Sequence, residues 1–299
     1  MKTKQLAPRW RQRGFTLVEA IVVMVVTGIL AGIMVLFIRQ PVQNYVDAAG
    51  RADMSDVADL ALRRITRELH GALPNSMRVT TIGSATLLEF IPTKAGGVYL
   101  AAEDDAGTPV LDFVNANLSF KVVSDWPAAP YNIVANPANP DYVVVYNLGP
   151  GYAGADAYAS APSARNRSQV SGVDSVNQII SMQDNPFAVG AAGVPNASPT
   201  HRFNIVKQPV TFSCAPNAVT GVPELRRYWN YGFQAAQIDP ATLANSNALL
   251  ASYVSNCSFS YGNTINLQHG LISLSLSVGR ANSTELVQLA QQVNVENTP

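Results

Sequence analysis

The feature that most constrains this chain is an uninterrupted apolar segment close to its start. Residues 20–38 contain no charged side chain, whereas residues 1–14 carry five basic side chains and no acidic one. As a helix the apolar segment would extend about 28 Å, which matches the hydrocarbon layer of a membrane, roughly 30 Å thick. Because the basic flank of a spanning segment stays in the cytoplasm, the sequence predicts that most of the chain is exported.

Glu19 is the residue that its surroundings explain least. An acidic side chain within a membrane helix costs about 2.5 to 3.5 kcal/mol on insertion scales, so it needs a compensating partner. The sequence at this point is Gly14-Phe15-Thr16-Leu17-Val18-Glu19. One interpretation is a simple signal anchor in which Glu19 reaches the lipid headgroups. We favour the alternative that Glu19 has a function tied to the surrounding motif, because chance would rarely place so costly a residue inside it.

This motif resembles the signature of type IV prepilins, a basic leader that ends in glycine and is followed by Phe-Thr-Leu-Val-Glu and a long apolar stretch. The resemblance implies that residues 1–14 are a leader, which a prepilin peptidase removes between Gly14 and Phe15 before the new amine of Phe15 is N-methylated. It also implies that Glu19 pairs with the Phe15 amine of a neighbouring subunit, so that each charge neutralises the other in a poorly polar environment. The partners implied are prepilin peptidase, other minor and major pilins, the inner-membrane assembly platform and, before assembly, membrane lipid.

The spanning segment, residues 15–40, is expected to continue as an amphipathic helix over residues 41–73. Apolar side chains recur there at steps of three and four residues, and charged side chains occupy the other faces. Pro41 removes one backbone hydrogen bond and is expected to bend the helix. Gly71 and Pro74 are expected to end it, so we predict one long helix from Phe15 to about Leu69.

Short β-like runs separated by turn residues fill residues 74–299, which we expect to form an exported globular domain. The clearest strand is 271–278, where Ile, Leu and Val alternate with serine. Residues 149–199 are rich in Ala, Gly, Ser, Asn and Pro, and we expect an insertion with a large loop component there, with one regular element at 175–182. Together the helix and the strands predict an α+β, pilin-like fold with mainly antiparallel sheets. The other expected strands cover residues 77–82, 85–91, 110–114, 118–123, 142–148, 203–214, 225–233, 258–261 and 285–295.

The two cysteines, Cys214 and Cys257, both lie in the part that is expected to be exported. An oxidising compartment permits a disulfide, and we predict that they pair. Closing this loop would stabilise the fold by roughly 4 kcal/mol. A metal site is not favoured, because the cysteines and His70, His201 and His269 show no ligand spacing.

The sequence does not point to an enzyme or to a cofactor. It lacks the motifs of nucleophile elbows, zinc peptidases, phosphate loops and dinucleotide-binding folds. Asp104-Asp105 has the character of a solvated loop and does not fit a calcium-loop pattern. Without the leader the chain has 15 basic and 20 acidic residues. This net charge of −5 does not favour nucleic acid as a partner.

An aromatic run at residues 226–233 suggests either a stacking surface for sugars or single-stranded nucleic acid, or a strand with an aromatic inner face. Strand alternation would put Trp229, Tyr231 and Phe233 on the same side. We favour the structural interpretation, because large aromatic residues commonly fill β cores.

A narrower resemblance is visible in segments after the apolar helix. Residues 41–79, 210–214, 257–261 and 292–297 resemble the O-type (MshO) minor pilins of the mannose-sensitive haemagglutinin pilus, while residues from about 90 to 200 resemble nothing that we can identify. This implies a minor pilin held in the inner membrane by a single pass, with its globular domain in the periplasm, and later placed at or near the tip of a surface pilus. The alternatives are a J-type pseudopilin of type II secretion, a tip adhesin for surface carbohydrate and, least favoured, an envelope-anchored enzyme.

Overall fold

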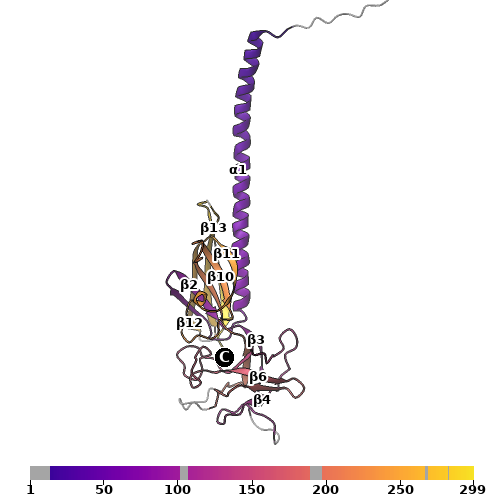
Figure 1. Cartoon of the computed structure of the whole chain (residues 1–299), viewed down its shortest axis with the longest axis vertical. Coiled ribbons are helices and arrows are strands. Elements are labelled where there is room, and N and C mark those ends of the chain that lie inside the picture. Colours follow the sequence, from indigo (N-terminus) through magenta and orange to yellow (C-terminus); the bar gives the residue numbers. More distant parts are fainter. Residues whose placement is uncertain (1–13, 102–106, 189–196, 267–268, 282) are drawn as a thin grey trace, which may run out of the picture. The chain divides into compact units, whose positions relative to one another are not determined.

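The computed structural model contains one long helix and antiparallel β-sheets, which make an α+β fold (Figure 1). The chain divides into two compact units that meet between Ala52 and Asp53, and helix α1 (Leu17–Leu69) runs through this boundary. The structure describes residues 14–101, 107–188, 197–266, 269–281 and 283–299.

In the first unit, α1 is the only regular element among the described residues. Its apolar side chains are exposed, and Leu30 and Phe37 keep 58% and 81% of their surface accessible. The helix continues through Pro41 without a break. The expected long helix is therefore confirmed, and it begins within two residues of the expected start.

The end of α1 lies in the second unit, where the backbone tightens before the first strand. The amide of Gly71 donates to Glu68 O at 3.1 Å, and the amide of Ala72 donates to Leu69 O at 3.1 Å. Such short-range bonds satisfy carbonyl groups that a helix leaves without a partner at its last turn. Gly71 and Pro74 thus lie just beyond the end of the helix, as expected.

Two sheets pack with this end of α1 around one hydrophobic core. A five-stranded sheet has the order β1-β2-β9-β10-β11, and a three-stranded sheet has the order β12-β13-β14. Ile65 of α1, Phe212 and Leu274 belong to the same buried cluster, so the helix and both sheets bury apolar surface together. The strand bounds are β1 Arg78–Ile82, β2 Ala85–Phe90, β9 Val210–Pro216, β10 Pro223–Trp229, β11 Ser246–Ser252, β12 Val254–Asn266, β13 His269–Gly279 and β14 Leu286–Glu296.

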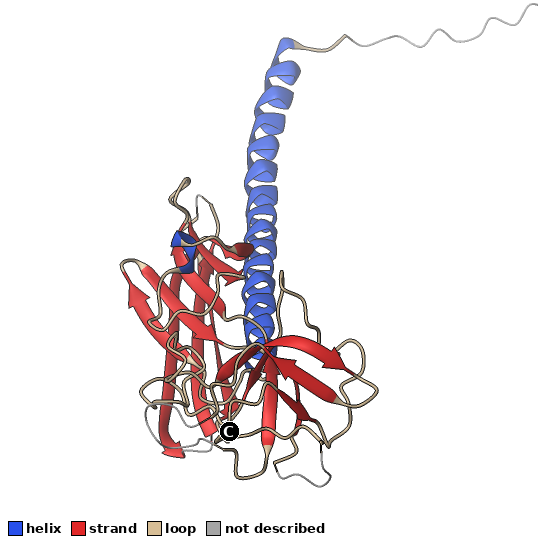
Figure 2. Ribbon diagram, turned by 60° about the horizontal axis from the view of Figure 1, so that its bottom comes forward, coloured by secondary structure: helices blue, strands red, loops and turns tan. Residues whose placement is uncertain are grey.

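A second β body is built from six further strands, in the order β3-β8-β5-β6-β7-β4 (Figures 1 and 2). Its two outer strands meet, because the amide of Leu100 donates to Lys121 O at 2.9 Å and the amide of Val123 donates to Val98 O at 2.9 Å. The sheet therefore closes on itself around buried residues such as Phe120, and closure leaves no free sheet edge between these strands. We call this body the barrel. Its strands are β3 Thr93–Val98, β4 Ser119–Lys121, β5 Tyr142–Val144, β6 Arg167–Asp174, β7 Ile179–Met182 and β8 Arg202–Val206.

The barrel is inserted into the five-stranded sheet. All its strands lie between β2 and β9, which are hydrogen-bonded neighbours with Phe90 opposite Val210. In chain order, β3 is the first strand of the barrel and β8 is the last. These two strands also pair, with Thr93 opposite Val206. The chain therefore leaves and re-enters the sheet at adjacent points.

The segment 149–199, for which a large loop was expected, contributes β6 and β7 to the middle of the barrel. The regular element expected at 175–182 overlaps β7. The inserted body is accordingly larger than 149–199 and extends from about Thr93 to Val206.

Two strand predictions were wrong. Residues 110–114 form no strand, although Val110 and Leu111 are buried. Residues 203–214 are not one strand, because β8 ends at Val206 and β9 begins at Val210, with Pro209 between them. Proline donates no ladder hydrogen bond and so marks the break between two sheets.

The prediction that Trp229, Tyr231 and Phe233 lie on the same side of one strand is also wrong in part. Strand β10 ends at Trp229, and Asn230 has a φ of 60°, which turns the chain. Trp229 packs against the core that contains α1, whereas Tyr231 reaches Thr211 on the other side of the sheet. Phe233 packs edge-on against Tyr142 of the barrel. The aromatic residues therefore have structural roles, but they pack in different parts of the fold.

Candidate processing and assembly site

The residues around the expected cleavage point precede the first turn of α1. Gly14, Phe15 and Thr16 have no regular structure, and Phe15 is 73% exposed. A side chain placed on Gly14 would meet no atom within 4 Å. The bond between Gly14 and Phe15 is thus sterically accessible in the described structure.

Thr16 caps the helix and thereby fixes where it begins. Its hydroxyl oxygen accepts a hydrogen bond from the amide of Glu19 at 3.3 Å. A threonine followed three residues later by glutamate is the pattern of a capping box, which satisfies amides that lack a partner in the first helical turn. Our sequence reasoning missed this role of Thr16, although the spacing to Glu19 carried the signal.

Glu19 lies in the first turn of α1, four residues from Phe15. The positive end of the helix dipole favours a carboxylate at this point. The side chain of Glu19 is exposed, and none of the described cationic residues pairs with its carboxylate. Cleavage at Gly14, methylation of Phe15 and pairing of Glu19 stay predictions.

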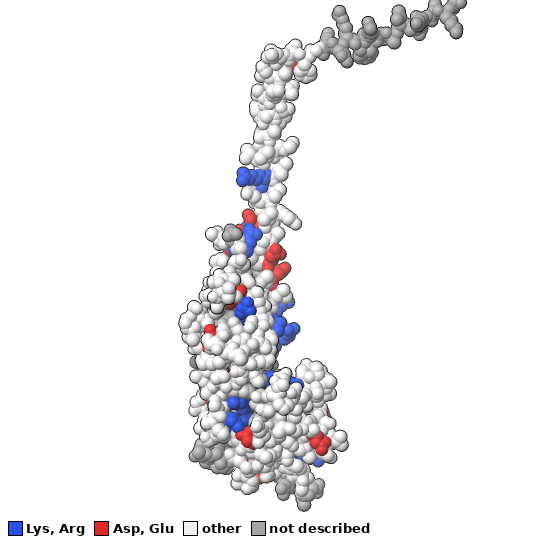
Figure 3. Space-filling model, in the orientation of Figure 1, with Lys and Arg blue, Asp and Glu red and all other residues white. Residues whose placement is uncertain are grey.

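The surface beyond Glu19 is apolar on all sides. Figure 3 shows a long stretch of α1 without charged atoms. Among the described helices, α1 has the length and composition needed to cross a membrane. An exposed helix that is hydrophobic all round is typical of a membrane span. This arrangement is consistent with a single-pass anchor near the N-terminus.

Cys214 of β9 and Cys257 of β12, which were expected to pair, form a disulfide that joins the two sheets packed on α1. Their Cα atoms are 6.2 Å apart, and Cys214 is buried. The bond therefore crosses the core between the sheets.

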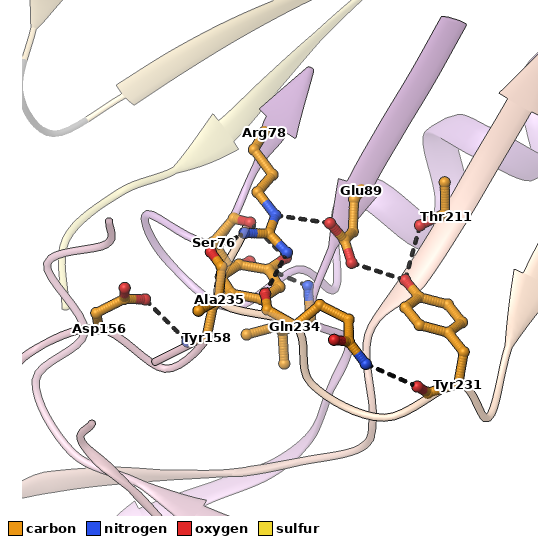
Figure 4. A network of polar contacts seen from close by, with 10 residues as sticks. Ser76, Arg78, Glu89, Asp156, Tyr158, Thr211, Tyr231, Gln234 and Ala235 are labelled. Carbon is orange, nitrogen blue, oxygen red and sulfur yellow. Dashed lines mark hydrogen bonds and ion pairs between the residues drawn. The ribbon is translucent and has the colours of Figure 1, made fainter. Parts of the chain in front are cut away.

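A buried polar network lies where the five-stranded sheet meets the barrel (Figure 4). Arg78 Nε donates to Glu89 Oε2 at 2.6 Å, and the hydroxyl of Tyr231 donates to Glu89 Oε1 at 2.8 Å. The guanidinium of Arg78 also lies 3.6 Å from the centre of the Tyr158 ring. Because Tyr158 belongs to the inserted segment, this network connects the two β bodies.

Glu89 has the electrostatic character of a buried acid. Burial raises its pKa, although the charge of Arg78 and the hydrogen bonds from Arg78 and Tyr231 act in the opposite direction. The remaining bonds of Arg78 go to the carbonyl oxygens of Gln234 and Ala235. The partners of Glu89 thus come from the fold itself, and we assign the network to stability.

The other candidate residues do not come together as a site. The structure places His70 just after α1, His201 before β8 and His269 at the start of β13. Among the described residues, no group of three or more His, Cys, Asp or Glu side chains could hold a metal ion. Asp104-Asp105 lies outside the described residues.

Comparison with known proteins gives a match at the N-terminus. Residues 11–35 match the prokaryotic N-terminal methylation motif. No curated protein and no solved structure matches the chain. The motif implies processing by prepilin peptidase and assembly with pilins, and it marks the chain as a type IV pilin-like prepilin.

Proposed function

We propose that this chain is a minor pilin of a mannose-sensitive haemagglutinin-like type IV pilus, assembled at or near the filament tip. The observation that carries the proposal is the methylation motif at residues 11–35 followed by an exposed apolar helix. The resemblance of the segments around Cys214 and Cys257 to O-type minor pilins supports the narrower assignment. The second candidate is a J-type pseudopilin of type II secretion, which would share these features.

The proposed mechanism is mechanical and electrostatic, without catalytic turnover. Before assembly, α1 holds the subunit in the inner membrane with its globular domain in the periplasm. After removal of residues 1–14, the amine of Phe15 becomes a cation that can pair with Glu19 of a neighbour. Contacts between helices then replace contacts with lipid as subunits leave the membrane. The exposed positions of Phe15 and Glu19 support this order of events.

The proposal is tested by capturing the neighbours of the subunit in cells that assemble filaments. A single cysteine replaces Val22, on the exposed part of α1, and a second variant carries one at the exposed Val219 of the globular unit. Cross-linked partners are identified by mass spectrometry. Capture of the minor pilins of a pilus supports the proposal, and capture of pseudopilins supports the second candidate. If neither cysteine variant captures a pilin or a pseudopilin, both candidate functions are contradicted.

A further inference from the structure

A groove of about 620 Å³ lies on the five-stranded sheet, on the face opposite the core. Successive residues of a strand point to opposite faces, so Leu225 faces the core while its neighbour Arg226 lines the groove. The walls are the β1–β2 turn, the β9–β10 loop and the segment that carries the short 3-10 helix η1 (Pro240–Thr242), drawn beside the strands in Figure 2.

The floor of the groove is a chain of polar side chains that hold one another in place. Asn217 Nδ2 donates to Glu224 Oε2 at 3.1 Å, and Arg226 Nε donates to the same oxygen at 2.6 Å. Arg226 Nη1 donates to Asn247 Oδ1 at 2.8 Å. Glu224 is only 9% exposed. These contacts fix planar amide, carboxylate and guanidinium groups before any ligand arrives, which reduces the entropy lost on binding.

Tyr228 completes the floor. It is 9% exposed, and burial raises the pKa of its hydroxyl, as do the charges of Asp239 and Glu224, while the charge of Arg226 lowers it. The hydroxyl therefore stays protonated at neutral pH. Burial alone would raise the pKa of Glu224, but hydrogen bonds from Asn217 and Arg226 and the charge of Arg226 hold it below its ordinary value. The groove thus offers a neutral donor beside a fixed carboxylate.

The charges in the groove select against a simple ion. Arg226 is accompanied by two acids, Glu224 and Asp239, so an anionic ligand meets carboxylates and a cationic ligand meets a guanidinium. The lining side chains include both hydrogen-bond donors and acceptors, and a sugar hydroxyl can act in either role. The volume is in the range of about 300–1,000 Å³ that is typical of ligand sites.

We propose that this groove binds a short neutral oligosaccharide through Glu224, Arg226, Tyr228 and Asn247. The site lies outside residues 149–199 and outside the apolar helix, so the proposal does not depend on the pilus assignment. A pseudopilin with this groove would bind the same class of ligand.

The test uses the full processed chain in detergent on an array of neutral hexose and N-acetylhexosamine oligosaccharides, with sialylated and sulfated counterparts. Asn247→Ala removes one planar amide of the floor, and Thr242→Trp fills the groove from its wall. The matched controls are Gln288→Ala and Gln288→Trp, at an exposed amide of β14 in the other sheet. Circular dichroism of each variant shows that it is folded.

We expect the wild type and both controls to bind neutral oligosaccharides equally. Asn247→Ala should weaken binding by about tenfold or more, which corresponds to the loss of one well-placed polar contact. Thr242→Trp should abolish it. The proposal is overturned if the wild type binds no neutral oligosaccharide, if it prefers the charged counterparts, or if both groove variants bind as well as their controls.

Discussion

Arg227 of β10 reaches the carboxylate of Glu68 in the last turn of α1, with its Nε 2.8 Å from Oε2 and 3.0 Å from Oε1. The two residues are 159 positions apart, and both side chains are more than four-fifths buried. Arg227 also lies over the ring of Trp229, at 4.9 Å. The end of the helix is therefore held to the sheet by an ion pair, and the guanidinium of this pair also packs on an aromatic ring.

Replacing Arg227 should destabilise the globular unit. Arg227→Ala leaves the Glu68 carboxylate with fewer partners at a mostly buried position, and we expect a loss of about 1–3 kcal/mol in the free energy of unfolding. Urea denaturation followed by circular dichroism measures it. The control is Arg63→Ala, whose pair with Asp59 is exposed to solvent and should therefore contribute much less to the free energy of unfolding. Equal losses for the two variants would show that burial of the pair does not matter.

Gly149 should not tolerate a side chain. Its φ is 89°, and a Cβ there would lie 2.6 Å from the carbonyl oxygen of Asn75. Gly151 has a similar φ of 98° but no atom within 4 Å of such a Cβ. Gly149→Ala is therefore expected to lower the free energy of unfolding by at least about 1 kcal/mol more than Gly151→Ala. If denaturant unfolding gives the same loss for both, the close approach to Asn75 is not what requires glycine.

Reduction of the disulfide should weaken the fold by about 4 kcal/mol, because it releases a long loop in the unfolded chain. Cys214 and Cys257 are the only cysteines in the sequence, so a reducing agent acts on this bond alone. The measurement compares urea denaturation with and without reducing agent. The double variant Cys214→Ser/Cys257→Ser should lose a similar amount and be insensitive to the agent. Unchanged stability of the wild type on complete reduction would contradict the prediction.

Glu89 should make stability depend on pH. Its pKa is raised in the folded state, so the folded chain holds the proton more tightly than the unfolded chain. Its stabilising contribution is full below the ordinary glutamate pKa and is lost as pH rises through the raised value. Relative to Glu89→Gln, the wild type should therefore lose free energy of unfolding as pH rises from the ordinary glutamate pKa through the raised pKa of the folded state.

Asp174 provides the opposite case for comparison. Hydrogen bonds from the backbone and side chain of Asn177 lower the pKa of this exposed carboxyl. The folded pKa is depressed, so its contribution is present above the ordinary aspartate pKa and is lost as pH falls through the lowered value. Relative to Asp174→Asn, the wild type should gain stability as pH rises. If the stability difference from the amide variant changed with pH in the same direction for both residues, the direction of the pKa shift assigned to one of them would be wrong.

Glu19→Ala should leave processing intact and reduce incorporation into filaments. The variant removes the carboxylate that is proposed to pair with the Phe15 amine, while the cleavage point is unchanged. Mass spectrometry reports leader removal, and immunoblots of sheared filaments report incorporation. Gly14→Val should instead block cleavage, so that mass spectrometry detects a retained leader. Normal incorporation of Glu19→Ala would exclude the proposed charge pair.

Much of the fold could be predicted because local patterns were strong. The long apolar stretch predicted α1, and the alternation of Ile272, Leu274 and Leu276 with serine marked β13, whose apolar side chains are buried. Strand β3 was missed because its sequence, Thr-Lys-Ala-Gly-Gly-Val, has two glycines and no alternation. Only its pairing with β8 makes it a strand. Tertiary contacts of this kind leave no periodic signal in the sequence.

The candidate sites likewise include residues that the sequence could identify and residues that it could not. Gly14, Phe15 and Glu19 stand in one contiguous motif and were recognisable from its resemblance to the prepilin signature. The groove on the five-stranded sheet could not be found, because Glu224 and Asn247 come from different strands, and the wall at Thr242 comes from the loop between them. Side chains from distant positions meet only once the register of β10 and β11 is known.

The adjacent entry and exit of the barrel have a consequence for how such chains can change. A linker from Phe90 to Val210 need only make a tight reversal, since these residues already face each other across β2 and β9. A change in the length of the segment between them, here called the cassette, does not require a change in the register of the β2–β9 hydrogen bonds, although Tyr158 within it also contacts Arg78 of the host sheet. Relatives of this protein are therefore expected to differ most in that cassette and least in the helix and sheets that carry it.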